Sequence, residues 1–107
     1  MKALIHQRRT ERFTLLYSLY RRTNGMSKHA VNLRDLAHNE GLGMRSFKSC
    51  FNYLCEEGCI RMHANSENPL DSYYASLTEH GLAVVEEVFK DENIETDFFP
   101  SFREMMM

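Results

Sequence analysis

The chain lacks the long apolar segment that a membrane protein needs. No uninterrupted apolar run approaches the roughly 20 residues of a membrane-spanning helix, and the amino terminus, MKALIHQRRTER, becomes charged too early for a secretory signal. With 43% hydrophobic and 26% charged residues in a length of 107, the composition is that of one ordinary globular domain with a modest core. These features predict a cytoplasmic protein with no membrane partner.

Cysteine is scarce, with three residues at positions 50, 55 and 59. An odd number without a secretory signal favours reduced thiols over a disulfide framework. Tetrahedral zinc usually takes paired ligands at closer spacing and a fourth ligand, and the five histidines form no pair at i, i+4. No metal site is therefore predicted. Cys50 and Cys59 fall at apolar positions, which leaves Cys55 as the candidate for a thiol switch.

Motifs of catalysis and of cofactor binding are also missing from the sequence. It contains no glycine-rich phosphate loop, no nucleophile elbow and no pair of carboxylates in an evident pocket. No catalytic residue and no cofactor are predicted, and the chain is expected not to be an enzyme.

The net charge of −2 hides a division along the chain. Residues 1–63 carry 11 Lys and Arg against 5 Asp and Glu, a net charge of +6, whereas residues 64–107 carry 2 against 10, a net charge of −8. Such asymmetry indicates a basic binding face and an acidic remainder. The alternative is that both runs are solvated surfaces without a partner.

The amino-terminal third of the chain predicts two helices. Apolar side chains lie at helical spacing in residues 10–22, with Thr10 available to cap the start. Leu15 and Leu19 fall outside the main apolar stripe, so the wide face can serve both the core and a second subunit; a monomer core is the alternative. After an Asn-Gly loop, a second helix begins with Asn32 as its cap.

A third helix is predicted for residues 44–57, after a tight turn at Gly41. Gly43 supplies a weaker cap than a serine or threonine would, and Gly58 closes the helix. One face has to be buried because it carries an apolar stripe, which consists of Phe47, Cys50, Phe51 and Leu54. The opposite face carries donors suited to phosphates and base edges: Arg45, Ser46, Lys48, Ser49 and Asn52.

A hairpin and a fourth helix complete the predicted order. Over residues 60–63 apolar side chains alternate with polar ones, as in a half-buried strand. The apolar pair is Ile60 and Met62, and the polar pair is Arg61 and His63. Residues 73–77 return as the second strand after a turn-rich loop. Thr78 then caps a helix that carries its own apolar stripe.

Several short fragments between Leu36 and Gly81 lie at a characteristic spacing from one another. They are LA (36–37), GL (41–42), Phe47, Leu54, EEGCI (56–60) and LTEHG (77–81). With them the chain resembles the winged helix-turn-helix of bacterial transcriptional regulators of the MarR and PadR type. The resemblance implies an α+β, mainly α fold, with three helices, a β-hairpin wing and a C-terminal helix in residues 1–92. Residues 93–107 form a C-terminal tail outside the pattern.

The resemblance implies a sequence-specific transcriptional regulator with the third helix in the major groove of double-stranded DNA. The residues expected to bind DNA are Arg45, Ser46, Lys48, Ser49 and Asn52 of that helix, with Arg61 and His63 of the first strand beside them. The wing loop, residues 64–72, lacks Lys and Arg and carries Glu67 and Asp71, so it is not expected to read the minor groove. The alternative is a winged-helix protein-interaction module that does not bind DNA.

A homodimer is predicted from apolar surface in excess of what one small core can cover. This surface comprises Leu15, Leu19, Val84 and the tail IETDFFPSFREMMM (94–107). Exposed patches of this kind usually find partners. The alternative is a disordered tail, because Pro100 and the acidic residues interrupt any regular pattern.

Overall fold

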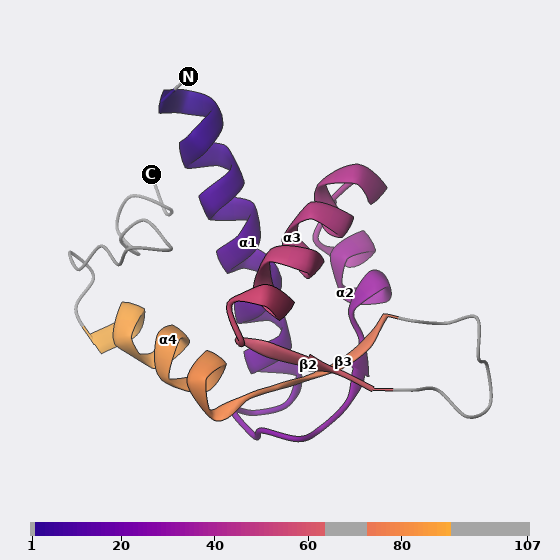
Figure 1. The fold of residues 1–107 in the computed structure, drawn as a ribbon, viewed down its shortest axis with the longest axis vertical. Coiled ribbons are helices and arrows are strands. Elements are labelled where there is room, and N and C mark those ends of the chain that lie inside the picture. Colours follow the sequence, from indigo (N-terminus) through magenta and orange to yellow (C-terminus); the bar gives the residue numbers. More distant parts are fainter. Residues whose placement is uncertain (1, 64–72, 91–107) are drawn as a thin grey trace.

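Four helices and a three-stranded antiparallel sheet make up residues 2–63 and 73–90, the part of the chain that the computed structural model describes. In order, they are α1 (Lys2–Arg22), β1 (Val31–Asn32), α2 (Leu33–Asn39), α3 (Met44–Glu56), β2 (Ile60–Met62), β3 (Tyr74–Leu77) and α4 (Glu79–Lys90) (Figure 1). The predicted α+β, mainly helical class is confirmed. The loop acids Glu67 and Asp71 and the tail 93–107 lie outside the described residues.

Helix α1 begins at Lys2, well before its predicted start at Thr10. Thr10 is not a cap, because its hydroxyl donates to the carbonyl oxygen of His6 inside the helix, at 2.9 Å. The side chains of residues 2–8 are exposed, so this part of the helix has no apolar stripe from which its period could be recognised. At 21 residues, α1 is about 30 Å long.

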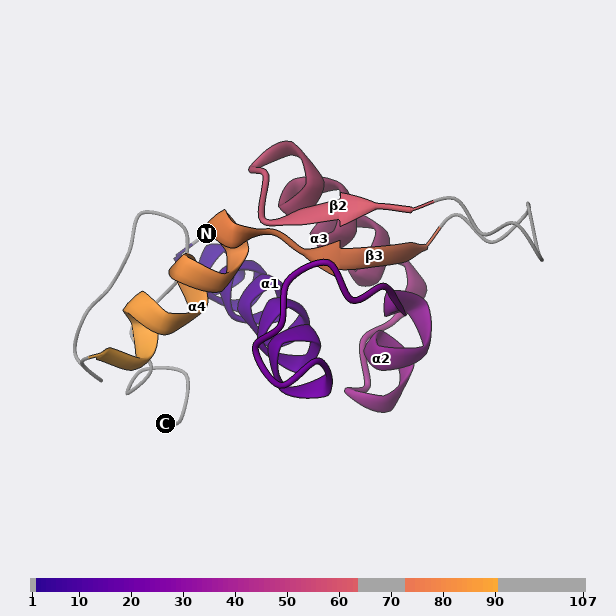
Figure 2. The same cartoon turned by 90° about the horizontal axis from the view of Figure 1, so that it is seen from below.

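The core surrounds the carboxyl-terminal half of α1. Helices α2, α3 and α4 and strand β3 all contact this helix (Figure 2). Leu15 and Leu19, which were expected to leave surface for a second subunit, are both 0% exposed. That expectation is wrong because α1 is covered on several sides within one chain. The predicted dimer therefore loses these two residues as support.

Local signals around α2 and α3 correctly locate the turns. The Oδ1 atom of Asn32 accepts from the backbone N–H groups of Arg34 and Asp35, at 3.0 and 3.3 Å, so the predicted cap is confirmed. Gly41 and Gly58 have φ of +77° and +75°, a region that favours glycine. Gly43 is the N-cap of α3 and makes no side-chain hydrogen bond there, as predicted.

The sheet has the order β1-β3-β2, and both pairings are antiparallel. Strand β1 was not predicted, since two residues are too short to show a period and the strand exists only through its pairing with β3. The hairpin of β2 and β3 is confirmed, with Ile60 opposite Leu77. Met62, however, is 58% exposed. Its predicted burial is wrong, and Met62 lies on β2, an edge strand of the sheet.

Helix α4 is held against the hairpin by its first turn. The hydroxyl of Thr78 accepts from the backbone N–H of Gly81 at 3.0 Å, so the predicted cap is confirmed. Gly81 itself lies so close to the main chain that a Cβ atom there would stand 2.1 Å from the carbonyl oxygen of Cys59. From the predicted stripe of α4, Val85 and Val88 are fully buried, whereas Phe89 is 36% exposed.

Candidate nucleic-acid interface

The buried face of α3 fixes the orientation of this helix. Phe47, Cys50, Phe51 and Leu54 are between 0 and 3% exposed, as their spacing predicted. The rings of Phe47 and Phe51 contact Tyr73 edge-on, with centroid distances of 5.1 and 5.3 Å. Because these contacts lie on one side, the opposite side of α3 has to face solvent.

The opposite side carries the five donors expected from the sequence. Arg45, Lys48, Ser49 and Asn52 are exposed, and Ser46 is half-buried. The first turn of α3 contains no acidic residue, so the positive end of the helix dipole and the nearby cations act together. The structure therefore brings these five residues onto one side of the helix, with two cations among them.

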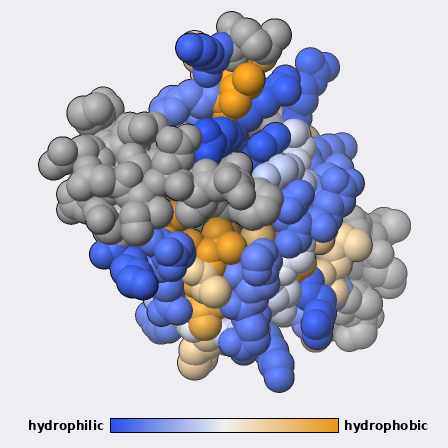
Figure 3. Space-filling view, turned by 60° about the vertical axis from the view of Figure 1, so that its left-hand side comes forward, coloured by the Kyte–Doolittle hydropathy of each residue, from blue (hydrophilic) through white to orange (hydrophobic). Residues whose placement is uncertain are grey.

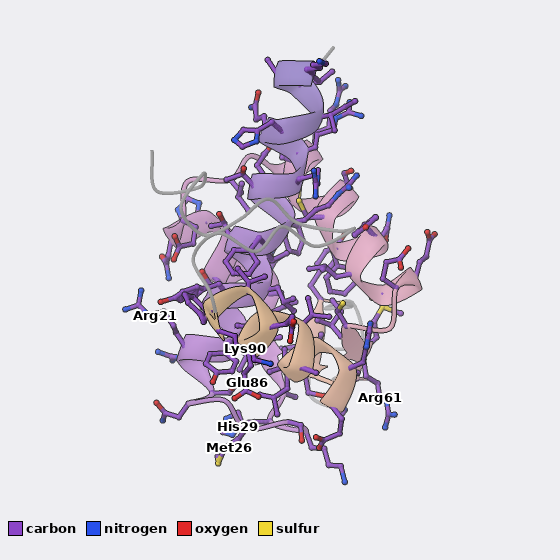
Figure 4. All side chains as sticks on the ribbon, turned by 90° about the vertical axis from the view of Figure 1, so that its left-hand side faces the viewer. Arg21, Met26, His29, Arg61, Glu86 and Lys90 are labelled. Atoms are coloured by element: carbon purple, nitrogen blue, oxygen red, sulfur yellow. The ribbon has the colours of Figure 1, made fainter. Side chains whose placement is uncertain are left out.

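Arg61 and His63 differ in how they lie relative to this surface of α3. Arg61 is exposed and projects from β2, beyond the carboxyl end of α3 (Figure 4). Arg45 lies in the first turn of that helix, at its other end. His63 is half-buried, and its Nε2 atom lies 2.7 Å from the hydroxyl oxygen of Ser76. That nitrogen is thus engaged within the hairpin.

Sequence reasoning missed the contribution of α1 to this side of the molecule. A groove of about 180 Å³ runs between the amino-terminal half of α1 and the first turns of α3. It is lined by Leu4, Gln7, Arg8, Glu11 and Arg12 of α1 and by Arg45, Ser46, Ser49 and Cys50 of α3. The charge of residues 8–12 was visible in the sequence, but Arg8 lies before the predicted start of the helix, and for Glu11 and Arg12 no local pattern shows that they lie against α3.

A cation–π contact fixes one edge of this groove. The guanidinium carbon of Arg12 lies 3.9 Å from the centroid of the Tyr53 ring on α3. Burial raises the pKa of the Tyr53 phenol, with the Glu57 carboxylate adding to the effect and Arg12 opposing it. Tyr53 is therefore neutral at physiological pH, and the guanidinium of Arg12 lies over its ring.

The cysteine thiols are not activated by their surroundings. Burial raises the pKa of Cys50 and of Cys59 to about 11. Burial also raises the pKa of Cys55, and the Glu56 carboxylate adds to it. A reactive thiol needs a lowered pKa, so these surroundings argue against a thiol switch at Cys55.

Two further hollows lie away from the donor surface. One, of about 340 Å³, lies between α2 and α3 and includes Asp35, His38 and Leu42. The other, of about 440 Å³, lies between α1 and α4, around Glu86, Lys90 and Arg21 (Figure 4). On the face in Figure 3, the hydrophobic areas are small and lie among hydrophilic residues.

Within residues 2–63 and 73–90, no three His, Cys, Asp or Glu side chains come together in a way that could hold a metal ion. None of the helices in these two segments combines the length and apolar character needed to cross a bilayer. A scan against protein-family models found no matching family, and searches of curated proteins and of solved structures found no matching protein.

Proposed function

We propose that the chain is a winged helix-turn-helix protein that binds double-stranded DNA and acts as a sequence-specific transcriptional regulator. In this proposal α2 and α3 form the helix-turn-helix, and the β2–β3 hairpin forms the wing. The order of the elements and the positive φ of Gly41 between the two helices support it. The observation that carries the proposal is the surface of α3, which exposes donors on the side opposite its buried stripe.

The roles of these donors follow from their chemistry and their place on α3. Arg45, in the first turn, has the planar fork that binds a guanine edge with two hydrogen bonds. Lys48 and Ser49, about one turn further on, suit phosphate oxygens. Asn52 can donate to and accept from an adenine edge. Arg61 contacts the DNA backbone beside the major groove. His63 contributes less to DNA binding because its ring is engaged by Ser76.

A homodimer remains part of the proposal, with its interface on α1 and α4. Phe89 of α4 lies 4.9 Å from Tyr17 and 6.1 Å from Phe13, centroid to centroid, and is still 36% exposed. This aromatic cluster, in place of the buried Leu15 and Leu19, is the apolar surface that supports the proposed homodimer. Two copies joined here would present two α3 helices to a palindromic site.

Selection of bound sequences from a random duplex pool tests the function directly. The expected result is an enriched motif with two half-sites, which the purified protein binds more tightly than random duplex at the same salt concentration. Failure of micromolar protein to retard any duplex at low salt would remove the DNA-binding proposal. The protein-interaction module would then be the better account of the fold.

A further inference from the structure

The groove between α1 and α3 has a charge that the α3 surface alone does not explain. Among the described residues that line it, Glu11 is the single carboxylate, against three arginines, Arg8, Arg12 and Arg45. The hydroxyls of Ser46 and Ser49 add two further donors. A concave site with net positive charge and several donors suits a tetrahedral oxyanion.

The position of the arginines is set by the fold. Arg12 is held against the Tyr53 ring at 3.9 Å, so its guanidinium needs little further ordering on binding. Arg8 lies one turn earlier on the same side of α1. The Cys50 side chain, also part of the lining, keeps its proton because burial raises its pKa to about 11. It therefore adds no negative charge that would repel an anion.

The dimensions of DNA indicate where the anion comes from. An α-helix with its side chains is about 10–12 Å across, and the major groove is about 12 Å wide. A helix lying in that groove therefore has a phosphate strand along each flank. Arg45 and Ser49 belong both to the exposed surface of α3 and to the lining of the α1–α3 groove. With α3 in the major groove, the DNA strand on the α1 side would therefore pass directly beside the α1–α3 groove.

We infer that the α1–α3 groove binds a backbone phosphate of the duplex that α3 reads, which makes the amino-terminal half of α1 a second DNA-contacting element. The inference rests on the proposed function. It assigns Arg8 and Arg12 a sequence-independent role, since a phosphate carries no base identity. The contact fixes how deeply α3 enters the major groove.

The test compares Arg8→Ala with Arg22→Ala by duplex-binding isotherms at several salt concentrations. Both arginines are exposed residues of α1, and they lie 14 positions, or about 20 Å, apart along the helix. Arg8→Ala is expected to weaken binding about tenfold at low salt and to make the salt slope shallower by about 1. The loss should be equal for selected and random duplex. Arg22→Ala should bind like the parent.

Different results identify different failures. If the parent binds no duplex, the proposed function fails and the groove assignment fails with it. If the parent binds and Arg8→Ala matches Arg22→Ala in affinity and slope, only the groove assignment is overturned. A second experiment asks whether the groove binds a free phosphate ion instead of a DNA phosphate. Inorganic phosphate is titrated into the protein, and the amide chemical shifts of α1 and α3 are monitored. Saturation below 1 mM together with an unchanged slope for Arg8→Ala would assign the groove to a free anion and overturn the backbone contact.

Discussion

The absence of a side chain at Gly81 allows α4 to lie close to the backbone of Cys59, directly before the hairpin. The φ of Gly81 is not in the left-handed region, so the requirement for glycine is one of space. The sequence placed this residue within the LTEHG fragment, but the physical reason appears only in three dimensions. The carbonyl of Cys59, 22 residues earlier, occupies the space where a Cβ atom would stand. A contact so distant in sequence leaves no local pattern.

Gly81→Ala is expected to destabilise the protein by about 3 kcal/mol, because overpacking against backbone cannot be relieved by a side-chain rotation. Gly43→Ala is the matched control, since a Cβ there meets nothing within 4 Å. Denaturant unfolding followed by circular dichroism measures both. Equal midpoints for the two variants would contradict the close approach of α4 to Cys59.

The buried thiols make stability depend on alkaline pH. Cys50 and Cys59 have a pKa of about 11 when folded and 9.0 as the reference value for the unfolded chain. Between these values the unfolded chain loses thiol protons that the folded chain keeps, so deprotonation favours unfolding. The melting temperature is therefore expected to fall as the pH rises from 9 to 11. A Cys50→Ala, Cys59→Ala protein should show a smaller fall across the same range, and parallel curves would exclude the thiols as the cause.

Elements with a strong local pattern were predicted well, and elements that depend on distant partners were not. Helix α3 was placed correctly because four apolar side chains at helical spacing and two glycines define it. Strand β1 exists through pairing with β3, and residues 2–9 of α1 are too polar to show a period. The same segment supplies Leu4, Gln7 and Arg8 to the lining of the candidate groove. The donors of α3 could be named from the sequence, but the arginines beside them could not be placed.

Replacing Arg45 and Lys48 of α3 by alanine separates function from stability. Both side chains are exposed, so the free energy of unfolding should change by less than about 0.5 kcal/mol. Binding to the selected duplex should weaken by about 1–3 kcal/mol for the base contact, with a shallower salt slope. A thermal melt and binding isotherms measure the two effects. A double variant that melts normally and binds as tightly as the parent would remove α3 as the recognition helix.

At the scale of the whole molecule, the described acidic residues within 64–107 belong to α4, which lies apart from α3. Helix α4, which carries Glu79, Glu86 and Glu87, lies on one side of α1, and α3 lies on the other (Figures 1 and 2). The central position of α1 keeps the acidic helix away from the basic surface. In the proposed complex, a duplex approaching α3 would meet the arginines of the α1–α3 groove before it meets the carboxylates of α4. The near-zero net charge says little about this local field.

In the proposed complex, DNA on α3 would lie on the side of α1 opposite α4, and the proposed dimer interface is on α1 and α4 (Figure 1). Phe89 is the residue to test, because it joins the aromatic cluster with Phe13 and Tyr17 and remains partly exposed. Parent protein at tens of micromolar is expected to sediment as a dimer, and Phe89→Arg as a monomer, since a charge in an apolar interface is costly to bury. Met26→Arg, which changes an exposed methionine in the loop after α1, is the matched control and should stay dimeric. The monomeric variant should also lose its preference for two half-sites over one. A parent protein that sediments as a monomer would remove both the dimer and the expected palindromic site.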